Sequence, residues 1–405
     1  MKKWLLAIVV VILLAMGIGW ASLDRDTRNL LAHLPTNADV LFWSTDQRDA
    51  AFRAMDALPF LAAARVIEAG DNVAPLPQGQ PLEIAVDDYM RDQRVAGMVI
   101  IHDDKIVLEK YGLDFSAHGR WTSFSVAKSL TSTLVGAAIK DGAIKSIDDK
   151  VSDYIPDLAG SAYDDVTIEQ LLTMTSGVKW NEDYADPDSD VARFNAHTPD
   201  AGVDATVSYM RKLPREAPAG EKWVYKTGET NLIGVLVSAA TQKPLSDYLS
   251  EKVWANYGME HDASWLLGPT DHEISGCCIQ ASTRDFARFG QFMANGAKAN
   301  GQSILPEGWI AKATAKQVGI GRAGKGYGYQ WWTFDDGSYA AQGIFGQGIF
   351  IDPARRLVIA SNGNWPIAAD EDTVGKHRDA FYRKVQTAID QSVGASPAYG
   401  GDGGG

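Results

Sequence analysis

Ser125 and Lys128 are the residues of this chain whose types and spacing best suit nucleophilic chemistry. They lie three positions apart in RWTSFSVAKSL, residues 120–130. Residues three apart share one face of a helix, so the Lys128 amine can reach the Ser125 hydroxyl if a helix begins here. To take the serine proton near neutral pH, the lysine needs a pKa lowered by roughly 3 units, or about 4 kcal/mol, through burial and cationic surroundings. The pair therefore predicts an enclosed site with an activated serine.

The Ser-x-x-Lys spacing is short, and it occurs again at Ser176 and Lys179. That copy follows a predicted helix whose end is marked by Gly177, so we interpret it as a coincidence. For Ser125 the alternative is a hydroxyl that starts a helix, with a solvated lysine one turn later. The four residues alone do not exclude this alternative, and the surrounding sequence has to decide.

The elements around this pair are expected to form one antiparallel sheet with a helical region inserted into it. Residues 97–112 are predicted to form two strands joined by an Asp103-Asp104 turn, and short aromatic or β-branched runs return near the C-terminus. Between them, residues 122–310 have mostly helical apolar spacing. A further helix is expected at about 370–391. Strands at both ends with helices between them predict an α/β (α+β) chain, and consecutive hairpins make the sheet antiparallel.

Further motifs follow Ser125 in a fixed order. They are Gly142, Asp148-Asp149, Tyr154 with Pro156, and Leu171-Leu172 to Thr175-Ser176-Gly177. This order resembles that of the serine β-lactamase-like hydrolases, which include class C β-lactamases, D-alanyl-D-alanine carboxypeptidases, esterases and 6-aminohexanoate-dimer hydrolases. The resemblance runs from about residue 75 to about residue 390. It implies a β-lactamase/transpeptidase-like fold, with Ser125 as the nucleophile and Lys128 as its base.

The same resemblance implies a tyrosine that opens a Tyr-x-Asn motif downstream. WVYKTGETNLIGVL supplies Tyr225 in that frame, although Thr227 stands where asparagine is usual. A phenol in this place can pass a proton between the serine oxygen and the leaving group. Without the frame, an aromatic residue packed beside Trp223 would be the simpler interpretation of Tyr225.

A late strand in this superfamily carries a Lys-Thr-Gly motif that borders the cleft. Lys226-Thr227-Gly228 spells it, but beside the tyrosine and at the start of a helix, so we assign the place to Ala341-Gln342-Gly343. The backbone N–H of Ile344 would then pair with that of Ser125 as an oxyanion hole, and Gly343 would let a substrate approach the strand. A glycine-marked bulge in the sheet is the alternative. Because alanine cannot hold a substrate carboxylate, efficient β-lactamase or carboxypeptidase activity is not expected.

The acidic segment WNEDYADPDSDVARF, residues 180–194, resembles the loop that brings a second tyrosine to the cleft in 6-aminohexanoate-dimer hydrolases. Tyr184 takes that position and is the second candidate for substrate binding, with Gly343. The acidic character of the loop would favour a cationic end of a substrate, such as a free amine. A solvated loop that never meets the substrate is the alternative.

The amino-acid composition and net charge limit which molecules the folded part of the chain is expected to bind. The chain has 405 residues, 45% hydrophobic and 22% charged, with a net charge of −13. This balance is typical of a folded protein and argues against nucleic acid or anionic lipid as a partner of the folded part. The seven histidines are scattered and fit no His-Glu-x-x-His pattern, and there is no Gly-x-Ser-x-Gly motif. We therefore expect no metal and no cofactor.

The N-terminal residues 1–23 place two lysines before an apolar run, which is typical of a signal peptide or an N-terminal membrane anchor. Either predicts export, to the periplasm or the outer face of the cytoplasmic membrane. The expected organisation is then a lead-in over 24–75, the hydrolase domain over 76–391 and a disordered glycine-rich tail over 392–405. Cys277 and Cys278 are adjacent, and we expect two small buried residues rather than a strained disulfide.

These expectations predict an exported serine hydrolase that cleaves a small-molecule amide or ester through an acyl-enzyme on Ser125. A cell-wall peptide carboxypeptidase-like enzyme and a non-catalytic envelope protein that binds through the same fold are the alternatives. Neither the natural substrate nor the oligomeric state follows from the sequence.

Overall fold

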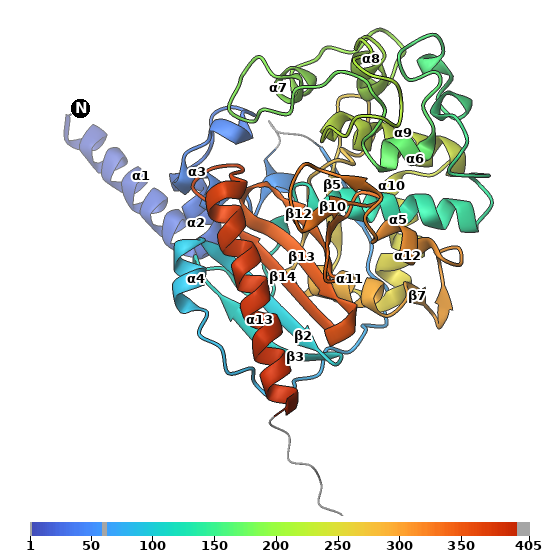
Figure 1. The fold of residues 1–405 in the computed structure, drawn as a ribbon. Helices are drawn as coiled ribbons and strands as arrows, with labels where there is room; N and C mark the ends of the chain where they lie inside the picture. The colour runs from blue at the N-terminus through green and yellow to red at the C-terminus, as the bar shows by residue number, and fades with distance from the viewer. Residues whose placement is uncertain (1, 59–62, 395–405) are drawn as a thin grey trace, which may run out of the picture.

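The computed structural model describes residues 2–58 and 63–394, and its centre is an eight-stranded antiparallel sheet (Figure 1). The strand order is β3-β2-β14-β13-β12-β11-β10-β9. The strands are β2 (Val95–His102), β3 (Lys105–Tyr111), β9 (Val318–Gly319), β10 (Lys325–Tyr327), β11 (Trp332–Phe334), β12 (Tyr339–Gly343), β13 (Gln347–Asp352) and β14 (Leu357–Gly363). Because β14 pairs with β2, the two ends of the chain build one sheet, as predicted.

The sheet is covered on both faces, and its strands alternate accordingly. Along β2, Val99 and Ile101 belong to the main core, whereas Met98 and Ile100 belong to the cluster that holds α13 (Lys376–Gly394). Figure 1 shows α13 lying across the strands on that face. On the other face α11 (Thr283–Ala294) packs so closely that a Cβ at Gly290 would lie 2.5 Å from a methyl of Val358. The sheet is therefore the middle layer between α13 and the inserted helical region.

The inserted region supplies the helices that the sequence predicts. They are α5 (Val126–Lys140), α6 (Ile168–Leu172), α7 (Asp190–Asn195), α8 (Ala205–Met210), α9 (Thr227–Thr241), α10 (Leu245–Leu249), the π-helical η5 (Ser250–Gly258), α11 and α12 (Trp309–Ala313). Helix α5 is buried along most of its length and packs against α9. The two longest helices of the insertion before α11 thus lie together in the core.

A second, four-stranded sheet was not predicted. Its order is β1-β5-β6-β4, with β1 (Ala64–Ile67), β5 (Ala263–Leu266), β6 (Ile279–Ala281) and β4 (Trp121–Thr122). These strands are too short for a periodic signal, and two of them, β5 and β6, interrupt a region expected to be mostly helical. A further small hairpin joins β7 (Lys298–Ala299) to β8 (Gln302–Ser303). The second sheet matters because β4 leads directly into Ser125.

The predicted lead-in, residues 24–75, packs onto the hydrolase core. It contains α2 (Arg25–Ala32), α3 (Thr45–Ala51) and β1, and α4 (Asp87–Asp92) follows it. Arg48 of α3 is 5% exposed, and its guanidinium donates to Asn364 Oδ1 at 2.7 Å and to the Trp43 carbonyl at 2.7 Å. The same guanidinium lies 4.6 Å from the ring centre of Phe345. This segment therefore supports the sheet rather than only preceding it.

At the N-terminus α1 (Lys2–Ser22) extends away from the body (Figure 1). Within the described residues, no helix combines the length and the apolar character needed to cross a membrane. At the other end α13 continues to Gly394, so residues 392–394 of the predicted tail are helical. The rest of the tail, 395–405, lies outside the described residues.

The expectation of two unpaired cysteines is wrong: the structure joins Cys277 and Cys278 by a disulfide. Cys278 is buried and has φ +77°, in the left-handed region. In an extended strand consecutive side chains point to opposite faces, and the positive φ breaks that alternation so that both sulfur atoms meet. This backbone conformation gives no signal in the sequence.

Candidate active site

Ser125 lies where the chain leaves β4 and enters α5. It is the N-cap of that helix, and its side chain is largely buried. Phe124, directly before it, has φ +40°, a conformation that a non-glycine residue adopts only when its surroundings hold it there. Its ring packs on Phe52 at 5.0 Å and on Phe345 at 5.4 Å between ring centres. The lead-in and the β12–β13 connection therefore hold the turn that presents Ser125.

Lys128 lies one helical turn further and is 1% exposed. Its Nζ donates to the Gly276 carbonyl at 2.6 Å and to Thr227 Oγ1 at 3.1 Å. Burial lowers the pKa of Lys128 to about 8, and the negative charge of Glu182 opposes this shift. A neutral amine has two N–H groups and one lone pair. Since both N–H groups have acceptors, the lone pair is the part of Lys128 that can take a proton.

Tyr225 completes the cluster at the start of α9. The Lys128 Nζ lies 5.4 Å from the centre of the Tyr225 ring. Burial raises the pKa of Tyr225 above its usual value, the charge of Glu182 raises it further, and a hydrogen bond with the Ser125 side chain acts in the opposite direction. The structure therefore brings Ser125, Lys128 and Tyr225 together.

The end of β12 lies against the backbone at Ser125. A Cβ on Gly343 would lie 2.8 Å from the Ser123 carbonyl oxygen and 3.0 Å from the Ser125 nitrogen. Ile344, which begins the 3₁₀ turn η6 (Ile344–Gly346), is half-buried, and Phe345 after it has φ +59°. The predicted second oxyanion donor is thus carried by the segment next to the Ser125 N–H, and only glycine fits at 343 without displacing it.

The acidic loop brings Glu182, which the sequence did not single out, to the same cluster. The Glu182 carboxylate accepts hydrogen bonds from Thr227 Oγ1, from the Thr227 N–H at 2.9 Å and from Trp180 Nε1. It also accepts from the Tyr184 hydroxyl at 2.8 Å. Burial and the charge of Glu182 together raise the pKa of Tyr184 well above its usual value. Tyr184 therefore points into the cluster rather than into solvent, and Thr227 links Glu182 to Lys128.

Aromatic side chains from β10 and β11 form the neighbouring wall. The Trp332 ring is stacked on Tyr225 at 5.6 Å between centres, with 21° between the planes. Tyr327 meets the same indole edge-on at 5.2 Å. The sequence predicted this stretch as strand, but strand alternation alone does not indicate which aromatic ring reaches the serine. The result is a serine, a buried amine and a phenol beside one carboxylate and an apolar surface.

The family model described as Beta-lactamase matches residues 82–382. The chain belongs to the β-lactamase family.

Within this family, the chain is 29% identical over 310 residues to the 6-aminohexanoate-dimer hydrolase of Paenarthrobacter ureafaciens, covering 72% of this chain and 78% of the relative. It is 25% identical over 256 residues to a putative D-alanyl-D-alanine carboxypeptidase of Escherichia coli (strain K12), covering 56% of each. Among solved structures, a putative 6-aminohexanoate-dimer hydrolase from Bacillus anthracis superposes with a TM-score of 0.74 at 21% identity, over 85% of this chain and 95% of that one. A family VIII carboxylesterase superposes with a TM-score of 0.56 at 18% identity, over 76% and 99%. The β-lactamase/transpeptidase-like fold is thereby confirmed.

Two motif assignments can be compared with the geometry of this β-lactamase-family chain. Lys226, the lysine of the misplaced Lys-Thr-Gly, is fully buried and lies 3.4 Å from Glu229, so it is a structural ion pair. Ser176 donates to the same Glu229 carboxylate, whereas Lys179 is exposed. In the second Ser-x-x-Lys copy the serine is therefore buried and the lysine is at the surface, so the two side chains do not form a site. Ala341 is buried in β12 and brings no charge to the strand beside Ser125.

Proposed function

We propose that this chain is a serine hydrolase that cleaves amide or ester bonds through an acyl-enzyme on Ser125. The single observation that carries the proposal is the state of Lys128, which is buried, has its pKa lowered to about 8, and has acceptors for both N–H groups of its neutral form. A lysine with only a structural role would be stabilised as a cation by a salt bridge. Here burial dominates, which favours the neutral amine that a general base requires.

In the proposed reaction the Ser125 oxygen attacks the carbonyl carbon while Lys128 takes the hydroxyl proton. The backbone N–H groups of Ser125 and Ile344 donate to the oxyanion of the tetrahedral intermediate. Tyr225, hydrogen-bonded with Ser125, passes the proton to the leaving amine or alcohol as the carbon–heteroatom bond breaks. Water then attacks the acyl carbon, its proton is taken by the same base, and the Ser125 hydroxyl is restored.

We further propose an amide substrate with an apolar chain and a cationic amino end. Trp332 and Tyr327 supply an apolar wall beside Tyr225. Glu182 and Tyr184 supply acceptors and negative charge on the loop that faces it. The relationship to a 6-aminohexanoate-dimer hydrolase, whose name describes such a substrate, supports the same class. Tyr184 and Gly343 are the proposed substrate-contacting residues.

An esterase is the second candidate, since the fold is shared with a family VIII carboxylesterase. A carboxypeptidase acting on cell-wall peptides is less favoured because Ala341 offers no cation to the substrate carboxylate. A non-catalytic binding protein would not need the lowered pKa of Lys128. For the location, the lysines and the apolar run of residues 1–23 support export to the periplasm or the outer face of the cytoplasmic membrane.

The test is covalent labelling of the purified protein with a fluorophosphonate, followed by intact mass and peptide mapping. One label per chain at Ser125 is expected in the wild type and in Lys179→Ala, the exposed lysine of the second Ser-x-x-Lys copy. Ser125→Ala and Lys128→Ala are expected to lose the label. Equal labelling of Lys128→Ala, or no labelling of a folded wild type, would contradict the proposal.

Substrate class is then assigned with a panel of a linear 6-aminohexanoate dimer, its N-acetylated form, short p-nitrophenyl esters and a D-alanyl-D-alanine peptide. The amine-terminated amide is expected to have the highest kcat/KM, and N-acetylation is expected to lower it mainly through KM. A preference for the esters with no measurable amide turnover would favour the esterase instead.

A further inference from the structure

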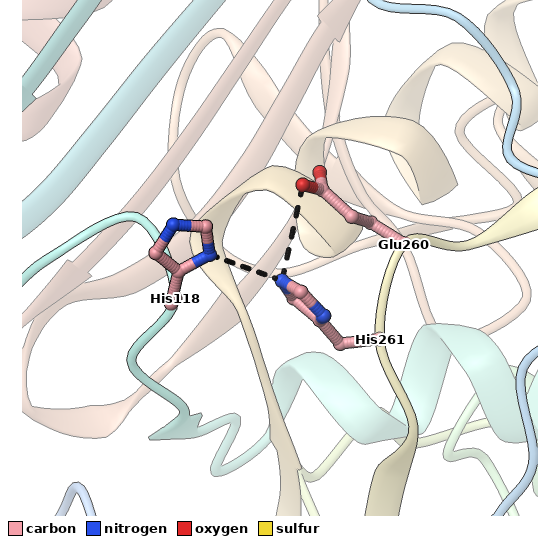
Figure 2. A group of neighbouring side chains, drawn as sticks. All are labelled: His118, Glu260 and His261. Carbon is pink, nitrogen blue, oxygen red and sulfur yellow. Dashed lines mark hydrogen bonds and ion pairs between the residues drawn. The ribbon is translucent and has the colours of Figure 1, made fainter.

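We infer that His118, Glu260 and His261 form a surface site for a divalent transition metal, with Zn²⁺ as the expected ion. Figure 2 shows a ring nitrogen of His118 and a carboxylate oxygen of Glu260 both turned toward a ring nitrogen of His261. One ligand atom from each residue lies within 4.8 Å of the other two. The sequence predicted no metal because its histidines are scattered, and 143 residues separate His118 from His261. Only the fold brings them together.

The spacing of the three donor atoms is close to that of a metal site. His118 Nδ1 lies 3.5 Å from His261 Nε2, and His261 Nε2 lies 3.8 Å from Glu260 Oε1. In tetrahedral zinc sites with Zn–N bonds of about 2.0–2.1 Å, neighbouring ligand nitrogens are ~3.3 Å apart. The two measured pairs therefore need to approach by up to about half an ångström, and the His118–Glu260 pair, which lies within 4.8 Å, by up to about 1.5 Å, a change that rotation of the exposed His118 side chain can supply.

The Glu260-His261 segment is held in place by groups that do not ligate. The backbone N–H groups of Glu260 and His261 donate to the two carboxylate oxygens of the buried Asp285, at 2.7 and 3.2 Å. Arg288 donates to Glu260 Oε2 at 2.8 Å. This leaves Glu260 Oε1 as the oxygen on the side of the imidazoles. Partners of this kind orient ligands in known metal sites and raise the affinity for the ion.

The charge around the site also suits a cation. Arg284 forms a bidentate salt bridge with Glu109, with hydrogen bonds of 2.7 and 2.9 Å. One of its guanidinium nitrogens also lies 3.5 Å from Glu260 Oε1. Arg288 pairs with Glu260 and Asp285. Three carboxylates thus face two guanidinium groups, which leaves one net negative charge, and an ion on Glu260 Oε1 would replace the 3.5 Å contact with Arg284. Two imidazoles and one carboxylate suit Zn²⁺, Ni²⁺ or Cu²⁺ better than Mg²⁺ or Ca²⁺, which prefer oxygen ligands alone.

The competing explanation is a plain hydrogen bond between the two imidazoles, in which one ring donates and the other accepts. Both explanations use the same nitrogen atoms, so metal binding and the hydrogen bond exclude each other. His118 is exposed and Glu260 and His261 are half-buried, which leaves further coordination positions to water. The site shares no residue with the Ser125 cluster. A bound ion would tie the turn that carries His118 to the segment before β5, and its effect is therefore expected on stability rather than on the reaction.

The experiment uses tag-free, chelator-stripped full-length protein titrated with ZnCl₂ by isothermal calorimetry, with the bound metal quantified after dialysis. One Zn²⁺ per chain is expected in the wild type. His118→Ala is the main variant because its side chain is exposed, so its loss does not disturb the core. At least a tenfold loss of affinity is expected there and in His261→Ala. His102→Ala is the matched control, since that imidazole faces a single carboxylate, Asp103, at 3.7 Å.

A second readout is independent of calorimetry. Zinc is expected to raise the Tm of the wild type and of His102→Ala but not of His118→Ala. Co²⁺ is expected to give visible d–d absorption bands that are lost in His118→Ala. Absence of 1:1 binding in the wild type, or the same affinity in His118→Ala, would overturn the inference and leave the imidazole hydrogen bond as the explanation. The hydrolase proposal would be unaffected by either result.

Discussion

Replacing Glu182 by glutamine is expected to move the acid side of the pH profile to lower pH. The general base must be neutral to act, so kcat/KM of the wild type is expected to fall about tenfold per pH unit below the Lys128 pKa of about 8. The charge of Glu182 raises that pKa against the larger, opposite effect of burial. Removing the charge while keeping the shape leaves burial unopposed, and the pKa of Lys128 should then fall further.

The size of the shift follows from the contacts of Thr227. Its hydroxyl accepts from Lys128 Nζ at 3.1 Å and donates to Glu182 Oε1, so the two charged groups are no more than about 6 Å apart. At an effective dielectric constant of ~20 to ~40, their attraction is about 3 to about 1.4 kcal/mol. Glu182 is half-buried, so the lower figure applies, and it corresponds to about one pKa unit. The midpoint of the acid limb is therefore expected near pH 7 in Glu182→Gln.

The assay is kcat/KM for a p-nitrophenyl ester between pH 5.5 and 9.5. Glu182→Asp, which keeps the charge, and Glu221→Gln, which removes a carboxylate from an exposed turn, are the controls and should keep the wild-type midpoint. A reduced plateau in Glu182→Gln is expected as well, because glutamine offers fewer acceptors to Thr227 and Tyr184. An unchanged midpoint, or a shift to higher pH, would refute the link from Glu182 to Lys128.

Three further changes test the rest of the site. Gly343→Ala is expected to lower kcat roughly 100-fold, because its Cβ would lie 3.0 Å from the Ser125 nitrogen and displace the oxyanion donors. Gly319→Ala is the control and should keep full activity, since a methyl group added there meets nothing within 4 Å. Lys128→Ala is expected to lower acylation at least 1000-fold at pH 8 with little change in Tm, as measured by rapid-quench and thermal unfolding. Arg48→Ala is expected to cost about 3 kcal/mol of unfolding free energy in urea, against less than about 0.5 for the exposed Arg91→Ala.

Much of the fold was predictable because its signals are local. The Asp103-Asp104 turn has φ of +49° and +61°, the conformation that short acidic turns favour between two strands. The continuous apolar run of β2 and the apolar spacing of α5 are equally readable. By contrast, β1, β4, β5 and β6 have two to four residues each, and their pairing depends on contacts far apart in the sequence. No local pattern can predict such strands.

Some residues of the candidate site were likewise predictable from the sequence, and others were not. Ser125, Lys128 and Tyr225 belong to motifs with a fixed spacing, so the resemblance placed them together before any geometry was known. Glu182 and the Gly276 carbonyl have no such spacing. Gly276 reaches Lys128 because Asn231 Oδ1 accepts from the Gly276 N–H at 2.7 Å. A backbone carbonyl carries no residue type, and one carboxylate among many in an acidic loop cannot be distinguished by sequence alone.

Thr227, the departure from the usual asparagine, acquires a physical reason in this setting. A hydroxyl accepts and donates through one oxygen atom, whereas an asparagine accepts through its oxygen and donates through a separate nitrogen. Thr227 therefore joins Lys128 and Glu182 through a single atom and keeps their charges close. Burial alone would lower the Lys128 pKa further than the value of about 8. The carboxylate limits that fall, and a base of higher pKa is the stronger one once it is neutral. Thr227 and Glu182 together thus keep the pKa of Lys128 low enough for the amine to be neutral near pH 8 and high enough for it to remain an effective base.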